Sequence, residues 1–173
     1  MITLLLKDGY RHLSDWFIII IEGCEIEMSG PALRQADSHS SIHEAAMGEA
    51  EQLTQLLRTC LAKEVFEEAY ETACIALEHW ESRTLAHAQA EEEGLYREIA
   101  ESRPEWQEKI VALTRDHELM RQLAEEIRQT LAEDVVDDGV VRRFEAMIPI
   151  DLLHNREEER MVAIVFEGGF KDE

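Results

Sequence analysis

The sequence predicts an all-α protein, folded as an antiparallel up-down four-helix bundle. Glycine and proline are scarce, 8 and 3 in 173 residues, and neither occurs between Gly48 and Gly94, which argues against a sheet built from many short turns. From Leu33 onward the apolar residues recur at intervals of three and four, the period of helices with one buried face. The pattern divides into four long helices with short connections, which favours antiparallel neighbours.

The first two helices are predicted over residues 32–61 and 64–100. Side chains three or four positions apart fall on one face of each helix, and this face is expected to be buried. On the first helix it carries Ala36, His39, His43, Ala46, Ala50, Leu53, Leu57 and Cys60. On the second helix it carries Tyr70, Cys74, Leu77, Thr84, His87, Glu91 and Leu95.

Proline and an acidic segment mark the third and fourth helices. Pro104 suits the first turn of a helix, because an N–H group there has no helical partner. The segment Asp134–Gly139 predicts an acidic turn, and Pro149 is expected to kink or divide the helix that follows. The third buried face carries Trp106, Ile110, Leu113, His117, Met120, Ala124, Ile127 and Leu131. The fourth carries Phe144, Met147, Asp151, His154, Glu158, Met161 and Val165.

Residues 1–27 lack this pattern and are predicted to be an accessory N-terminal arm or an upstream extension, with the bundle over residues 28–173. Their strongest apolar run, Trp16–Ile21, is far shorter than the roughly 20 residues that span a bilayer, so no membrane association is expected. No CxxC pair occurs among the three cysteines, which are Cys24, Cys60 and Cys74. A disulfide framework is therefore not predicted, and a reducing cytoplasm is the expected location.

The chain is strongly acidic. It has 17 Lys and Arg residues against 38 Asp and Glu residues, a net charge of −21. Such a surface repels phosphate backbones, so nucleic acid is not an expected partner. Apolar residues make up 45% of the chain and recur periodically, which separates it from a disordered acidic tail.

Histidines interrupt the buried faces in a regular way. Each helix carries one of them, namely His43, His87, His117 and His154. Two of these are followed four residues later by a carboxylate, from Glu91 and from Glu158, and this spacing stacks the two side chains one helical turn apart. Because each helical hairpin supplies one histidine and then an HxxxE pair, the pattern predicts a site with approximate twofold symmetry.

A pair of metal ions is the natural explanation of these six residues. Buried imidazoles and carboxylates without partners each cost several kcal/mol of stability. Imidazole with carboxylate suits iron and, less specifically, manganese or zinc. Two carboxylates shared between two cations can bridge them at roughly 3.5–4 Å. The sequence therefore predicts a dimetal centre in the bundle.

Taken singly, these residues have simpler interpretations. A lone histidine on an apolar face is usually a satisfied core residue, and Glu91 and Glu158 lie in runs of glutamates that are typical of solvated helix faces. Only the joint phasing favours a metal site. His12 and His79 lack it and are expected at the surface. Packing at the core or its rim is expected for Tyr96 and Trp106.

Four segments support a family assignment. They are LAHAQAEEEGLY (85–96), LTRDHELMRQL (113–123), LLHNREEERMV (152–162) and, more weakly, SIHEAAMGEAEQL (41–53). Together they resemble the hemerythrin-like, or HHE cation-binding, domains. The resemblance implies a four-helix bundle that holds a non-haem di-iron centre, in which an oxygen atom bridges the two iron ions. By resemblance, the terminal ligands are His43, His87, His117 and His154, and the bridging carboxylates are Glu91 and Glu158.

The sequence departs from the oxygen-carrying hemerythrins at one position. Those proteins have five histidine ligands, the extra one from an HxxxH pair on the third helix, whereas the residue four before His117 is here Leu113. A missing nitrogen ligand favours an open position on one iron, and hence reactivity over reversible oxygen carriage. His39, four residues before His43, is a possible additional ligand. Glu64 and Glu68 are further candidates.

Three hypotheses follow for function. The first is a di-iron protein that binds O₂, NO or peroxide, or stores or senses iron, with a peroxide-consuming or iron–sulfur-repair enzyme as a variant. The repair proteins usually add paired cysteines, and only Cys24 is present here. The second is a non-redox module whose metal is structural and whose acidic surface binds a partner protein. The third is a metal-free bundle. Each is compatible with a monomer or a homodimer.

Overall fold

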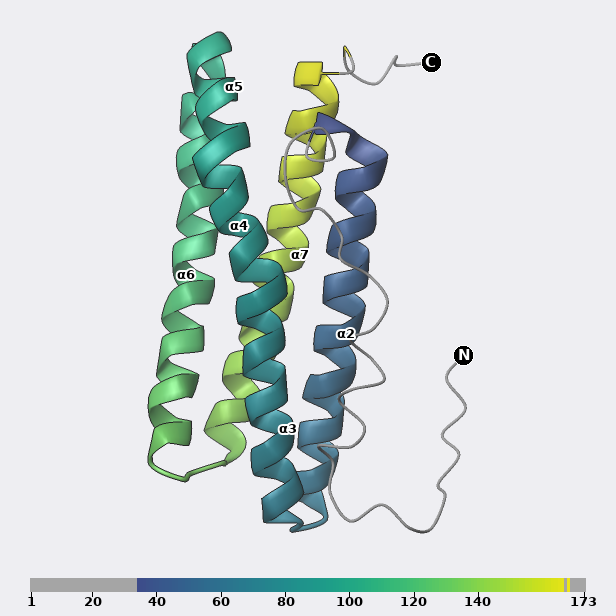
Figure 1. Ribbon diagram of the computed structural model, residues 1–173, viewed down its shortest axis with the longest axis vertical. Coiled ribbons are helices and arrows are strands. Elements are labelled where there is room, and N and C mark those ends of the chain that lie inside the picture. The colour runs from purple at the N-terminus through teal and green to yellow at the C-terminus, as the bar shows by residue number, and fades with distance from the viewer. Residues whose placement is uncertain (1–33, 167, 169–173) are drawn as a thin grey trace.

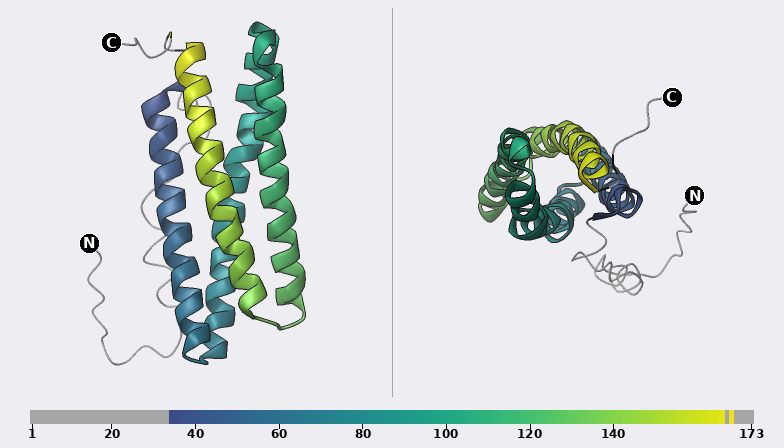
Figure 2. Two further views of the ribbon diagram at one scale, coloured as in Figure 1. Left: turned by 180° about the vertical axis from the view of Figure 1, so that it is seen from behind. Right: turned by 90° about the horizontal axis from the view of Figure 1, so that it is seen from above.

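The structure, a computed structural model, describes residues 34–166 and Gly168. Across this range the regular elements are all helical, with no strand among them. Four helical stretches lie side by side along one long axis and are joined by short connections (Figures 1 and 2). The predicted arm, residues 1–27, lies outside the described residues, as do His12, Cys24 and the Trp16–Ile21 run.

The first stretch is α2 (Ala36–Ala62), close to the predicted range of 32–61. The second comprises α3 (Phe66–His79), η2 (Trp80–Leu85), α4 (Ala86–Ala90), η3 (Glu91–Leu95) and α5 (Tyr96–Ser102). The elements η2 and η3 are π-helical turns, which insert residues into an otherwise α-helical stretch and occur often at functional sites. The sequence predicted one helix here, and its π turns were not foreseen.

The third stretch opens with a 3₁₀ turn, η4 (Pro104–Trp106), which leads into α6 (Gln107–Ala132). Pro104 therefore stands at the start of the helical stretch, as predicted. The fourth stretch is α7 (Asp138–Phe166), which continues through Pro149. Of the two effects predicted for Pro149, a kink or a division, the division does not occur. The acidic turn is also shorter than the predicted Asp134–Gly139, because the side chain of Asp137 accepts a hydrogen bond from Val140 N–H at 3.1 Å, in the first turn of α7.

Two helices end on residues with left-handed backbone. Glu64 after α2 has φ 58° and Asp134 after α6 has φ 55°. In each case the next residue's N–H bonds back into the helix, Val65 to Cys60 O at 3.1 Å and Val135 to Thr130 O at 3.4 Å. Glycine usually occupies such positions because a Cβ atom is strained there. These reversals keep both connections short.

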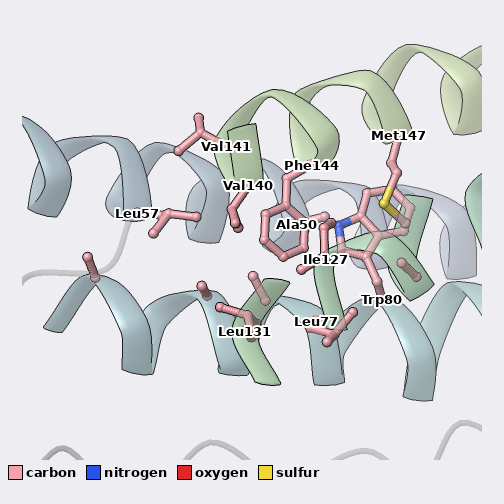
Figure 3. Close-up of a cluster of buried hydrophobic side chains, with 14 of the residues drawn as sticks. Ala50, Leu57, Leu77, Trp80, Ile127, Leu131, Val140, Val141, Phe144 and Met147 are labelled. Atoms are coloured by element: carbon pink, nitrogen blue, oxygen red, sulfur yellow. The ribbon is translucent and has the colours of Figure 1, made fainter. Parts of the chain in front are cut away.

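The buried apolar side chains form two clusters. The larger one includes Leu57, Trp80, Ile127 and Phe144, and Figure 3 shows Trp80, Phe144 and Met147 side by side at its centre. The smaller one contains Leu95, Tyr96, Ile99, Ile110, Leu113, Met161 and Val162. Along α7 the larger cluster ends at Met147 and the smaller begins at Met161. The residues between these two positions include His154 and Glu158, so a polar layer separates the clusters.

The buried face of α3 differs from the prediction. Tyr70 and Cys74 are only partly buried, whereas Ala69 and Ala73 are completely buried. Alanine on this face lets α3 pack closely against α2, and the Tyr70 hydroxyl instead donates a hydrogen bond to Leu131 O at 3.0 Å. None of the helices within residues 34–166 has both the length and the apolar character of a membrane-spanning segment.

Candidate metal centre

The polar layer contains all six predicted site residues. His43, His87, Glu91, His117, His154 and Glu158 are each at most 7% exposed. They come from all four helical stretches: His43 from α2, His87 and Glu91 from the second, His117 from α6, and the last two from α7. The periodicity argument therefore placed them correctly on the buried side of every helix.

The first group of potential ligands lies between α2 and the second stretch. His39, His43, His87 and Glu91 each offer one ligand atom, and these atoms lie within 4.8 Å of one another. Glu91 Oε1 is 2.7 Å from His39 Nε2 and 2.7 Å from His87 Nε2. The Nε2 atoms of His43 and His87 are 3.1 Å apart. Three imidazole nitrogens and a carboxylate oxygen thus converge on one point.

The second group faces the first across Glu91. It contains Glu91, His117 and His154, again with ligand atoms within 4.8 Å of one another. The Nε2 atoms of His117 and His154 are 3.0 Å apart, and His117 Nε2 is 3.5 Å from Glu91 Oε2. The two oxygens of Glu91 therefore face different groups, which is the geometry of a bridging carboxylate.

Glu158 lies beside both groups and is completely buried. Its Oε2 atom is 3.3 Å from His39 Nε2 and 3.6 Å from the Nε2 atoms of both His43 and His154. Neither carboxylate oxygen of Glu158 has a hydrogen-bond partner. Its charge is therefore balanced only by the nearby histidines, and a metal ion could occupy the same position.

Two further carboxylates orient the histidines, and sequence reasoning missed them. Glu92 Oε1 is 2.7 Å from His117 Nδ1, and Glu159 Oε1 is 3.2 Å from His43 Nδ1. A carboxylate at Nδ1 fixes the tautomer and leaves Nε2 free to bind a metal. The signal was present, since Glu92 and Glu159 each directly follow one of the two predicted bridging glutamates.

The charges in the polar layer shift its pKa values strongly. Burial alone lowers the pKa of His39, but the neighbouring Glu158 and Glu91 outweigh it and raise the pKa to about 9. Burial likewise opposes protonation of His43, yet Glu159, Glu91 and Glu158 raise its pKa to about 10. For Glu158, burial and the charge of Glu91 raise the pKa, but the histidines outweigh them and lower it to about 2. In the absence of metal, protons on histidine therefore balance the buried carboxylates.

The residues fit a pair of transition-metal ions. Two imidazole nitrogens bound to one ion at about 2.1 Å, at a right angle, lie about 3.0 Å apart. The His43–His87 and His117–His154 nitrogen pairs have this spacing, 3.1 Å and 3.0 Å. In residues 34–166, the ion pairs of Glu91 and Glu158 involve histidines alone, with no lysine or arginine. These His and Glu groups could hold metal ions in place of the protons.

Other predicted residues are placed as follows. His39, the possible additional ligand, is completely buried in the first group, whereas the candidates Glu64 and Glu68 are exposed beyond the end of α2 and at the start of α3. The prediction of a surface position for His79 is wrong. Its side chain is buried because its Nε2 hydrogen-bonds to Ala46 O at 2.9 Å, a backbone partner that periodicity does not reveal.

The two aromatic residues pack as predicted. Trp106 is partly buried against the smaller apolar cluster, and Tyr96 is a buried member of it. Tyr96 also reaches the polar layer, where its ring stacks on His117 with centroids 5.9 Å apart.

Compared with models of known protein families, with curated proteins and with solved structures, the chain matches none of them.

Proposed function

We propose that this chain is a hemerythrin-like, non-haem di-iron protein. Its centre binds O₂, NO or peroxide, or stores or senses iron. The observation that carries the proposal is the convergence of five buried histidines in two groups that share Glu91, with the buried Glu158 beside both groups. Imidazole with carboxylate suits iron and, less specifically, manganese or zinc.

His39 supports the proposal by restoring the ligand count. The oxygen-carrying proteins of the resembled family have five histidines, with the HxxxH pair on the third helix. Here Leu113 occupies that position, but His39 and His43 form an HxxxH pair on α2. The first group then has four ligand atoms and the second has three. In the proposal the second ion therefore keeps more open coordination positions.

The protein residues have distinct roles in this centre. Glu91 and Glu158 hold the two ions together, and Glu92 and Glu159 fix the ring orientation of His117 and His43 through Nδ1. When bound, an iron pair supplies reversible one-electron chemistry at each ion. The fold that accompanies the proposal is an antiparallel up-down bundle, which is supported by the short connections and by the packing of α2 against both α3 and α7.

Metal analysis tests the proposal directly. Protein purified from iron-supplemented cells should hold about two irons per chain, and exposure of the reduced protein to air should produce new absorption between roughly 300 and 500 nm. A chain without transition metal, whose stability is indifferent to chelators, would refute the proposal. Two metals with no spectral response to O₂, NO or peroxide would favour the second candidate.

That candidate is a binding module with a structural metal. The net charge of −21 favours it, because such a surface attracts basic protein partners. In this alternative the ions stabilise the bundle by binding only its folded form.

A further inference from the structure

A cavity lies directly beside the polar layer. It has a volume of about 200 Å³, and its wall includes His43, His87, His117 and His154 together with Glu91. A single water molecule needs about 15 Å³ by the same kind of measure, so the cavity has room for several small molecules. It extends toward the surface at Glu49, which is exposed, and at Arg83, which is half-buried. Small molecules therefore have space to reach both ligand groups.

The wall of the cavity also contains polar side chains outside the two ligand groups, which an oxygen pocket does not require. Asp151 and Asn155 of α7 line it and are 3% and 8% exposed. Thr84, from the π turn η2, lines it too, and its hydroxyl is buried without a hydrogen-bond partner. Across the described chain, no lysine or arginine forms an ion pair with Asp151. The carboxyl of Asp151 accepts a hydrogen bond from the Asn155 side chain, whereas the buried Thr84 hydroxyl has no partner and points to a polar ligand.

We propose that Asp151 makes this cavity selective for hydrogen peroxide. The inference rests on the proposed function, because it concerns the ligand of the same centre. The carboxylate of Asp151 accepts a hydrogen bond from one peroxide O–H, and the unpartnered hydroxyl of Thr84 in the same wall is available to donate to the other oxygen. Asp151 thereby positions peroxide beside the two ligand groups.

The chemistry of the alternatives explains the selectivity. O₂ and NO carry no hydrogen atom, so they cannot donate to a carboxylate. Small anions such as azide are repelled by its negative charge in a site of low dielectric constant. Burial raises the pKa of Asp151 to about 6, against the opposing charges of His43 and His154. Hydrogen peroxide is neutral and has two O–H donors, and it fits these conditions.

The test compares Asp151→Asn and Asp151→Leu with the full-length parent chain, all loaded with iron. The control is Glu78→Gln, which removes one negative charge from an exposed position of α3. Stopped-flow absorption gives the rate constants for oxidation of the reduced proteins by hydrogen peroxide and by O₂. Titration of the oxidised proteins gives the dissociation constant of azide. Thermal unfolding of the metal-free proteins reports on packing without any bound metal.

Both variants should bind azide about tenfold more tightly, and Asp151→Leu should react with peroxide about tenfold more slowly, the factor that corresponds to about 1.4 kcal/mol. Asp151→Asn keeps an acceptor oxygen, so its reaction with peroxide should slow less. The reaction of both variants with O₂ and their metal content should match the parent, as should every property of the control. The metal-free Asp151→Leu protein should unfold at an equal or higher temperature, because a buried carboxyl has been removed.

Unchanged peroxide and azide constants would overturn the role of Asp151 and leave the di-iron proposal intact. Loss of metal, or a lower unfolding temperature in the metal-free variants, would make Asp151 a structural residue instead. Equal slowing with peroxide and O₂ would show that Asp151 controls access and not selectivity. A parent chain that binds no metal would overturn the proposed function and this inference together.

Discussion

Replacing Glu91 with glutamine removes the charge of the side chain that reaches both ligand groups while it keeps the size of that side chain. Glu91 Oε1 lies 2.7 Å from two imidazole nitrogens of the first group, and Oε2 lies 3.5 Å from His117 Nε2 in the second. After the change, the first group retains three histidines and the second retains two. Three histidines still suffice for a metal site, whereas the second ion would keep only His117, His154 and the more distant Glu158, whose Oε2 is 3.6 Å from His154 Nε2.

The magnitude follows from the short distances. At an effective dielectric constant of 20, a unit charge about 3 Å from an opposite unit charge contributes about 5 kcal/mol. Half of that energy corresponds to nearly a 100-fold change in affinity, because each 1.4 kcal/mol is a factor of ten. We therefore expect Glu91→Gln to weaken binding of the second ion by nearly 100-fold, so that the purified variant holds one metal per chain or none. Glu158→Gln should also lose metal.

The assay is elemental analysis of the purified proteins, followed by competition with a chelator of known affinity. Glu93→Gln is the matched control, since Glu93 lies in the same run of glutamates but is exposed and accepts a hydrogen bond from Gln89 at 2.8 Å. It should retain two metals. If Glu91→Gln also retained two metals with unchanged affinity, the bridging role would be refuted.

Three further predictions concern orientation, pH and helix ends. Glu92→Gln should weaken metal binding about 10- to 100-fold in chelator competition. Glu159→Gln should have a smaller effect, because Glu159 lies 3.2 Å from His43 whereas Glu92 lies 2.7 Å from His117. If both variants bound metal as tightly as the parent, the orienting role of these carboxylates would be contradicted. In the metal-free protein, the raised pKa values of His39 and His43 contribute stability that is complete below the unfolded value of 6.5 and lost as pH rises through about 9 to 10. The lowered pKa of Glu158 contributes stability that is present above pH 4.5 and lost as pH falls toward about 2. The urea midpoint of the metal-free protein should therefore be highest between the acidic range in which Glu158 loses its contribution and the alkaline range in which His39 and His43 lose theirs. A midpoint that rises from pH 7 to pH 10 would show that the carboxylates do not stabilise the protonated histidines. Asp134→Gly should relieve the left-handed backbone at φ 55° and raise the thermal midpoint by about 2–4 °C for a gain of about 1 kcal/mol, while Glu133→Gly, at a residue with φ −93°, should not.

Helical periodicity was sufficient to predict a helical bundle and the burial of the six residues, because a spacing of four places His87 with Glu91 and His154 with Glu158 on one face. It could not predict the π turns, which depend on a change of backbone hydrogen bonding and have no fixed composition. For that reason the predicted buried face of α3 was shifted by one residue, to Tyr70 and Cys74 in place of Ala69 and Ala73. Periodicity likewise predicted that Asp151 is buried but assigned it no function, because the cavity that its side chain lines is visible only in the structure.

Glu92 and Glu159 were missed for a different physical reason. Their side chains are 25% and 30% exposed, so the description of their runs as solvated helix faces is partly correct. Each reaches a histidine on a different helix, 25 and 116 residues away in sequence. Contacts at that separation depend on tertiary packing, which a helical repeat does not encode.

The two ligand groups differ in their number of histidines, and this difference lies at one pair of equivalent positions. His39 stands four residues before His43, and Leu113 stands four residues before His117, so the internal repeat aligns them. The first is a fully buried member of a ligand group, and the second is 1% exposed within the smaller apolar cluster. The asymmetry of the centre therefore depends on a single substitution between its two halves.

His39→Leu should make the two groups equivalent, each with two histidines and Glu91. In the parent, titration of the metal-free chain with Co²⁺ should show a tight first ion, bound by four ligand atoms, and a weaker second ion. In the variant, the first affinity should fall toward the second, while leucine at the core preserves burial without a polar atom. Two clearly separated affinities that persist in His39→Leu would show that His39 is a buried hydrogen-bond partner of Glu91 and not a ligand, and the inequality would then have to come from the surroundings of the two groups.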